Sequence, residues 1–137
     1  MRFQAFTLTE LQKAQGDDAY REFLRRAGMS LGLYRLAAGK TDRQHPHATD
    51  EVYLVISGRA MLQVEDRSIE VSTGSVVSVD HGVDHHFTDI TEDLTLLVVF
   101  APPTTPEAQP SASRDVAAGV GCRLGLDAAG NVNVSRG

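Results

Sequence analysis

Between Leu31 and Phe100, short apolar segments follow one another and are separated by turn residues. The segments are rich in Val, Ile, Leu, Phe and Tyr, and no helical period runs between them. They are Leu31–Leu36, Val52–Ile56, Ala60–Val64, Ser68–Val71, Val76–Val79, His85–Phe87 and Leu94–Phe100. Short strands spaced in this way are typical of an antiparallel sandwich or barrel. We therefore predict an all-β fold.

The residues before this region predict a different element. Thr7 and Glu10 have the spacing of a capping box, which indicates a short helix over residues 7–15. The apolar positions of Tyr20–Arg26 suit either a helix or a strand. We expect a strand there, because everything that follows is β-like.

The composition changes after the last apolar segment. Four of the five prolines lie between Pro102 and Pro110, and a tail rich in Ala, Ser and Gly follows. We predict a helix and lead-in over residues 1–24, a barrel over 25–103 and a separate tail over 104–137. The tail is either disordered or forms a small hairpin around residues 127–130.

Charge and composition exclude several classes of protein. The net charge of −5 and the sequence pI near 5.4 leave no excess of basic groups to bind nucleic acid or an anionic membrane surface. No apolar run is long enough to span a bilayer, and the N-terminus has no secretion leader. The single Cys122 excludes an internal disulfide. We expect a soluble cytoplasmic protein.

The histidines are the most informative residues, because all five lie between positions 45 and 86. His45, His47 and Glu51 share the same parity, so an extended strand would point all three the same way. His85 would join them from a second strand. Three imidazoles and one carboxylate form a mixed nitrogen and oxygen set that suits one divalent transition metal, Fe(II), Mn(II), Ni(II) or Zn(II). Calcium and magnesium prefer oxygen ligands.

Two sequence motifs carry a resemblance to a known family. The run from Gly39 to Gly58 resembles the first motif of the cupins, G-x(5)-H-x-H-x(3,4)-E-x(6)-G, at every defined position. The run that begins at Gly74 is similar to the second motif, G-x(5)-P-x-G-x(2)-H-x(3)-N. In this second motif Asp80 replaces the proline and Asp89 replaces the asparagine. We expect the turn at Asp80 to survive and Asp89 to affect a loop rather than the metal.

The resemblance covers roughly residues 25–101 and implies a jelly-roll barrel, the double-stranded β-helix. It also implies that His45, His47, Glu51 and His85 are the metal ligands. The adjacent His86 is expected on the opposite face of its strand, and His81 in an exposed turn.

The activity follows less directly from the sequence. We expect a metal-dependent enzyme, a dioxygenase, isomerase or lyase, that acts on a small oxygen-rich molecule. The alternatives are a non-catalytic cupin that serves as a sensor or storage module, or a barrel that the metal only stiffens.

Three further features accompany this interpretation. Tyr53 shares the parity of Glu51 and is the candidate catalytic residue, which could orient substrate or donate a proton, although a tyrosine in a barrel wall also packs. Arg35 either binds an anionic substrate or faces water. A homodimer through an N-terminal edge strand is also expected.

Overall fold

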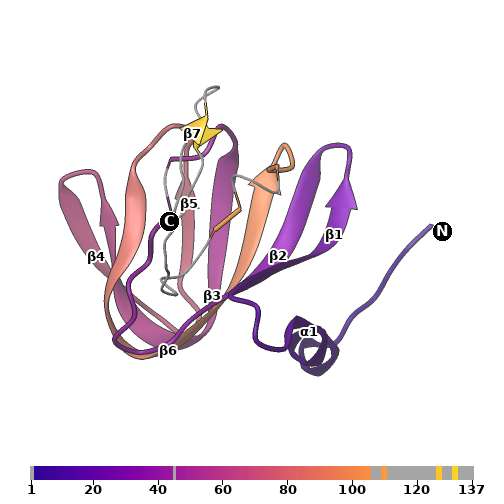
Figure 1. The fold of residues 1–137 in the computed structure, drawn as a ribbon, viewed down its shortest axis with the longest axis horizontal. Coiled ribbons are helices and arrows are strands. Elements are labelled where there is room, and N and C mark those ends of the chain that lie inside the picture. The colour runs from indigo at the N-terminus through magenta and orange to yellow at the C-terminus, as the bar shows by residue number, and fades with distance from the viewer. Residues whose placement is uncertain (1, 45, 106–108, 111–125, 128–130, 133–137) are drawn as a thin grey trace.

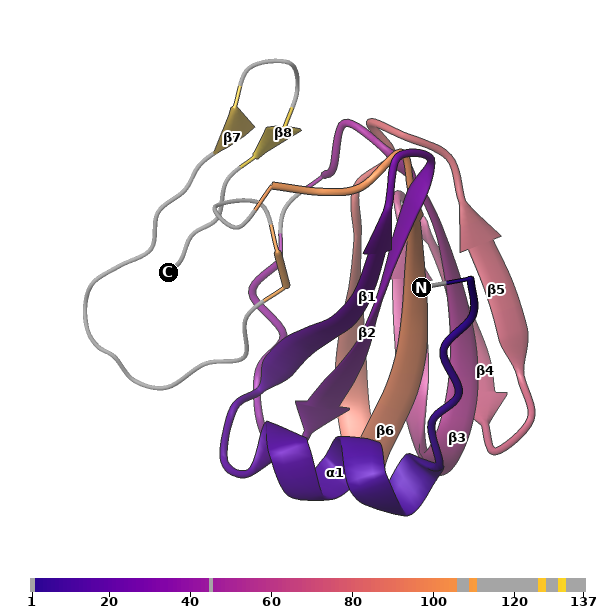
Figure 2. The same cartoon turned by 90° about the vertical axis from the view of Figure 1, so that its right-hand side faces the viewer.

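The protein is described here by a computed structural model. It describes residues 2–44, 46–105, 109, 110, 126, 127, 131 and 132. The first element is the helix α1 (Leu8–Gln15), whose N-cap Thr7 and third residue Glu10 form the predicted capping box. Each side chain accepts a hydrogen bond from the other residue's backbone N–H, which satisfies two donors that a helix start otherwise leaves open. α1 lies beside β1 and β2 at one end of the barrel (Figures 1 and 2).

Antiparallel strands form the rest of the fold, and this confirms the predicted all-β jelly roll with a short N-terminal helix. The strands are β1 (Tyr20–Arg26), β2 (Met29–Leu36), β3 (Asp50–Val64), β4 (Arg67–Ser72), β5 (Val76–Val79) and β6 (His85–Ala101). They pair in the order β1-β2-β6-β3-β4, and β5 pairs with β3 on the other side. Figure 1 shows the long strands β3 and β6 curving together through the whole barrel. The sheet begins at Tyr20, so part of β1 lies in the region assigned above to the lead-in.

The predicted boundaries inside β3 and β6 were wrong. The segments expected to end near Gly58 and near Thr91 continue as two single strands that bend. Gly58 has φ 105°, and a Cβ there would lie 2.3 Å from the backbone oxygen of Asp93. Glycine is therefore needed both for the backbone conformation and for the close approach of β6. The chain bulges here instead of reversing.

These bulges change which side chains face inward. In β3 the buried positions are Glu51, Tyr53 and Val55 before the bulge, and Ala60 and Leu62 after it. Buried positions therefore move from odd to even numbers, as an extra residue in one strand requires. β6 shows the same change on either side of Asp89, whose φ is 47°. Asp89 thus lies at a bend inside β6 and not in the loop that was expected, and its side chain is exposed.

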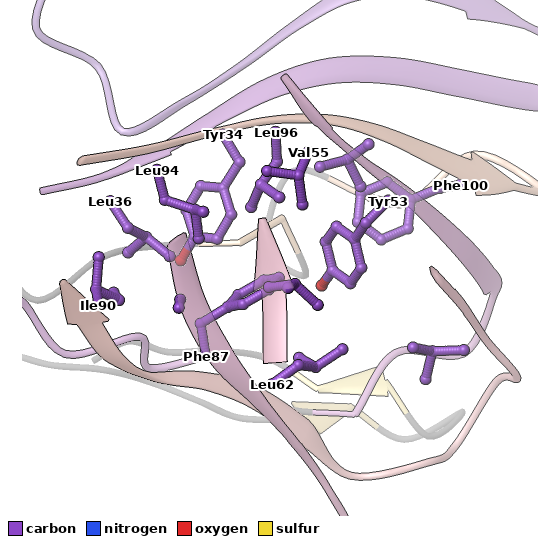
Figure 3. Packing of buried hydrophobic residues seen from close by; sticks show 14 residues of the cluster. Tyr34, Leu36, Tyr53, Val55, Leu62, Phe87, Ile90, Leu94, Leu96 and Phe100 are labelled. Atoms are coloured by element: carbon purple, nitrogen blue, oxygen red, sulfur yellow. The ribbon is translucent and has the colours of Figure 1, made fainter. Parts of the chain in front are cut away.

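The barrel interior is filled by side chains from β2, β3 and β6. Figure 3 shows them pointing toward one another across the barrel. Its labelled members are Tyr34, Leu36, Tyr53, Val55, Leu62, Phe87, Ile90, Leu94, Leu96 and Phe100, all at most 5% exposed. Burying one large apolar side chain of this kind contributes about 1.5–3 kcal/mol, so the cluster is the main source of stability.

The described part of the tail contains two short strands. β7 (Leu126–Asp127) pairs with β8 (Asn131–Val132), at the place where a hairpin was one of the two expectations. Most of the tail, including Cys122, lies outside the described residues. No helix among the described residues is long and apolar enough to span a membrane.

Candidate metal centre

Three of the four predicted ligands meet inside the barrel. Glu51 lies at the start of β3, His85 at the start of β6, and His47 in the loop before β3. Their side chains are at most 3% exposed. One possible ligand atom of each lies within 4.8 Å of those of the other two. His85 Nε2 is 2.9 Å from Glu51 Oε1, and His47 Nε2 is 3.9 Å from the same oxygen. His45, the fourth predicted ligand, lies outside the described residues.

The predicted reason for this convergence was wrong, although the residues meet. The parity argument required an extended strand from position 45 to position 51, but β3 begins only at Asp50. Residues 46–49, which precede it, form no strand, and the chain bends at Ala48 and Thr49. His47 therefore reaches Glu51 through the path of the loop. Strand alternation applies only from Asp50 onward, where it places Glu51 and Tyr53 on the inner face.

The loop is attached to the turn before β6. The backbone N–H of Gly82 donates to the backbone oxygen of His47 over 2.7 Å, and Val83 N–H donates to Asp80 O. The turn at Asp80 thus forms without the proline of the second motif. Asp50 accepts two hydrogen bonds from His81, one from its backbone N–H and one from Nδ1 at 3.1 Å. These contacts join the two motifs at the edge of the cluster.

The charges of the cluster stabilise one another. Burial alone would lower the pKa of His85, but the negative charge of Glu51 and the contact between them raise that pKa to about 9. Burial would raise the pKa of Glu51, but the positive charges of His47 and His85 bring it below its usual range. Without a metal, the structure therefore favours a protonated His85 beside an ionised Glu51 at neutral pH.

The other nitrogen of His85 determines which atom faces the cluster. His85 Nδ1 lies 2.9 Å from the backbone oxygen of Val83, and a carbonyl oxygen can only accept a hydrogen bond. Nδ1 therefore carries a proton, and the free electron pair of a neutral His85 is on Nε2. Hydrogen bonding at the second nitrogen is how proteins orient histidine ligands.

Sequence reasoning missed a buried polar network beside the cluster. Asp42 and Gln44, 4% and 6% exposed, precede His47 in the segment between β2 and β3. The Tyr34 hydroxyl donates to Asp42 Oδ1 over 2.6 Å, and the backbone N–H of Phe87 donates to Oδ2 over 2.8 Å. Burial raises the pKa of Asp42, and these hydrogen bonds limit the increase. The only signal in the sequence was two polar residues two positions apart before the histidines.

Tyr53 lies at the junction of this network and the cluster. Its hydroxyl donates to Gln44 Oε1 over 3.1 Å and lies 3.0 Å from His85 Nε2. Burial and the charges of Glu51 and Asp42 raise the pKa of Tyr53 well above its usual value. The phenol is therefore neutral at physiological pH and can make hydrogen bonds as donor or acceptor.

Two other candidates lie away from the cluster. The guanidinium of Arg35 donates hydrogen bonds to the backbone oxygens of Gly16 and Asp18, just after α1. It therefore does not face the barrel interior, and it bonds to the protein as well as facing water. His86 follows His85 in β6 and is only partly buried, as the alternation of the strand requires. The side chain of His81 is 72% exposed.

The donor set fits a metal ion. Donor atoms on one ion of the zinc or iron class lie about 2.0–2.2 Å from it and hence about 3–3.5 Å from one another. The two distances from Glu51 Oε1, 2.9 Å and 3.9 Å, lie on either side of that range. The imidazoles of His85 and His47 lie 2.9 Å and 3.9 Å from Oε1 of the buried Glu51 carboxylate. A metal ion bound to the neutral imidazoles would supply the positive charge that this buried carboxylate needs.

Comparison with known proteins agrees with this geometry. The family model described as the cupin domain matches residues 32–100, which include His47, Glu51 and His85. This chain is a cupin. An uncharacterized protein of Streptomyces coelicolor is 55% identical to this cupin over 102 residues, which cover 73% of this chain and 97% of the relative.

Solved structures share the fold of this cupin at low sequence identity. Ectoine synthase from P. lautus is 20% identical, with a TM-score of 0.62 over 75% of this chain and 80% of the synthase. The protein TT1209 from Thermus thermophilus is 22% identical, with a TM-score of 0.61 over 74% of this chain and 99% of TT1209. An RmlC-like cupin from Methanocaldococcus jannaschii is 19% identical, with a TM-score of 0.60 over 74% of this chain and 93% of the RmlC-like protein. Such identities show the fold alone.

Proposed function

We propose that this cupin is a metal-dependent enzyme that acts on a small oxygen-rich molecule, as a dioxygenase, isomerase or lyase. The observation that carries the proposal is the buried cluster of His47, Glu51 and His85 with the hydroxyl of Tyr53 beside it. In the proposal, His45 completes the ligand set from the same sequence motif. The ion is Fe(II), Mn(II), Ni(II) or Zn(II), because two or three imidazoles and one carboxylate suit this class.

The metal and the protein would have different tasks. A divalent ion with one carboxylate ligand retains positive charge, so it can polarise a carbonyl, stabilise an enolate or support chemistry with O₂. Tyr53, as a neutral phenol, would form a hydrogen bond to a substrate oxygen and orient it. Phe100 packs its ring against His47 with 5.0 Å between ring centroids, and this apolar contact keeps water from that side of the imidazole.

The burial of the cluster favours a second candidate function. All three described ligands are almost completely buried, as in sites where a metal only stabilises a fold. In that case the protein binds metal without turnover. The same burial also suits an enzyme that excludes water from its reaction, so the two candidates must be separated by experiment.

Elemental analysis of the purified protein followed by activity screening tests the proposal. We expect one equivalent of a transition metal per chain, and turnover of small hydroxy or keto acids or sugars, with or without O₂ uptake, once that metal is restored. Tyr53→Phe should lower turnover and leave the metal content unchanged. Stoichiometric metal without turnover of any such compound would favour the second candidate, and absence of metal would contradict both.

We also propose that the chain is a cytoplasmic homodimer with no nucleic-acid partner. β1 is an edge strand of the sheet, and the exposed Met29 follows it in the β1–β2 hairpin, so a second copy could pair along this edge. The net charge of −5 supports the absence of a nucleic-acid partner. Light scattering should give twice the chain mass, and a monomeric mass would contradict the dimer.

A further inference from the structure

The side chain of Gln44 presents one end to a carboxylate and the other to the metal cluster. Its Nε2 donates to Asp42 Oδ2 over 2.8 Å. Its Oε1 accepts a hydrogen bond from the Tyr53 hydroxyl over 3.1 Å and lies 3.2 Å from His47 Nε2. An ionised carboxylate only accepts hydrogen bonds, so Asp42 requires the nitrogen end on its own side. The amide oxygen of Gln44 must therefore face the cluster.

Asp42 is itself held in place by two donors from other elements. Tyr34 in β2 donates to Oδ1, and the backbone N–H of Phe87 in β6 donates to Oδ2. Gln44 Nε2 shares Oδ2 with Phe87. The orientation of the Gln44 amide is thus determined by β2 and β6 together, before any metal binds.

Metal binding determines whether His47 Nε2 can donate a hydrogen bond to Gln44 Oε1. In the metal-free arrangement, a proton on His47 Nε2 can bridge to Gln44 Oε1. When Nε2 binds a metal, it has no proton, and two electron-rich atoms face each other across 3.2 Å. This arrangement is repulsive unless a cation lies against both. Two ligand atoms on one ion lie about 3–3.5 Å apart, so the observed separation already suits a shared ion.

We propose that Gln44 Oε1 is a further oxygen ligand of the metal ion in this cupin. The inference rests on the proposed function, in that a metal must occupy the cluster. Gln44 occupies an undefined position of the first motif, so the motif itself does not assign it a role. A neutral oxygen ligand adds no charge but raises the number of protein ligands. It therefore favours six-coordinate Mn(II) or Fe(II) over four-coordinate Zn(II).

Metal affinity of Gln44 variants provides the first test. We expect Gln44→Leu and Gln44→Asn to bind Mn(II) at least about tenfold more weakly than the wild type in competition titrations. The asparagine variant keeps an amide but is too short to reach both Asp42 and the ion. Gln63→Leu is the matched control, because the side chain of Gln63 makes its hydrogen bonds to Glu65 and Ser68 at the surface, and this variant should bind Mn(II) as the wild type does. Equal affinity in all four proteins would overturn the inference.

Infrared spectroscopy distinguishes a ligand from a residue that only orients its neighbours. With glutamine labelled by ¹³C at the side-chain carbonyl, Mn(II) should shift one labelled band to lower wavenumber, because coordination weakens the C=O bond. A shift to higher wavenumber would indicate only a lost hydrogen bond and would overturn the inference. The shift should disappear in Gln44→Leu and persist in Gln63→Leu. If both Gln44 variants fail to fold, the direction of the shift in the wild type decides.

Asp42→Asn gives a conservative control for the orientation argument. The backbone N–H of Phe87 and Nε2 of Gln44 both donate to Oδ2 of Asp42. The carbonyl oxygen of an asparagine can therefore replace Oδ2, with its NH₂ group toward the Tyr34 hydroxyl. We expect this variant to keep the infrared shift and to retain Mn(II) affinity within a few fold. A lost shift would contradict the orientation argument. Wild-type protein that binds no metal would overturn the proposed function as well, whereas unaffected Gln44 variants overturn only this inference.

Discussion

The same strands build two halves of the barrel interior from opposite chemistry. In one half, Leu36, Leu62 and Leu94 belong to the apolar cluster, and in the other, Glu51 and His85 face each other at the same degree of burial. Burial of the apolar side chains contributes about 1.5–3 kcal/mol each. Removing a charged group from water costs several kcal/mol, which a partner ion must offset. The comparison indicates that one half stabilises the fold, and it supports the proposal that the other half binds a metal ion.

Removal of one imidazole should have the largest effect on the polar half. We expect His47→Ala to abolish stoichiometric metal, because the alanine offers no donor to the ion that Glu51 and His85 share. His86→Ala should keep its metal, since its side chain lies on the other face of β6. Elemental analysis of the two purified variants checks this. The opposite result would show that His86, and not His47, is a ligand.

A truncation in the apolar half should instead affect folding. Leu62 is fully buried, so Leu62→Ala should lower the free energy of unfolding by about 2–5 kcal/mol in urea titrations. Val76→Ala, at a side chain that is 67% exposed, should change it by no more than about 0.5 kcal/mol. If His47→Ala destabilised the metal-free protein as much as Leu62→Ala does, the distinction between the two halves would fail.

The pH dependence should have opposite signs with and without metal. In metal-free protein the raised pKa of His85, about 9, means that its ion pair contributes stability below the unfolded pKa of about 6.5 and loses it as the pH rises through 9. The lowered pKa of Glu51 adds stability that is lost at acid pH. Metal must displace the His85 proton, so metal affinity should rise with pH toward 9.

Thermal melts of chelator-treated and metal-loaded protein between about pH 5 and pH 10 measure this contrast. The difference in Tm between the two forms should increase with pH. Calorimetry in buffers of different ionisation enthalpy should show proton release on metal binding near neutral pH. A difference in Tm that does not vary with pH would count against His85 as a ligand.

A surface ion pair should have the smallest effect. Arg59 Nη1 lies 2.6 Å from Glu70 Oε2, but both side chains are about half exposed. Exposed pairs contribute little, so Arg59→Ala should change the free energy of unfolding by no more than about 1 kcal/mol. It should leave metal content unchanged. A larger loss would show that charges outside the barrel also support the fold.

The order of the elements could be predicted because it depends on local chemistry. The capping box at Thr7 determines where α1 begins, and short apolar segments indicate strands. The strand boundaries at Gly58 and Asp89 could not be predicted, since a positive φ suits a turn and a bulge equally well. Only the close approach of β6 to Gly58 decides that the strand continues.

By itself, the sequence determined the fold class and the residue types that can bind a metal, because motif spacing and side-chain chemistry are local properties. Only the tertiary structure decided that Asp42 and Gln44 lie beside the cluster, since their positions depend on hydrogen bonds from Tyr34 and Phe87, which lie eight and 45 positions from Asp42 along the chain. Hydrogen bonds between distant segments leave no periodic pattern in a sequence, so the orientation of the Gln44 amide becomes visible only once the barrel has closed.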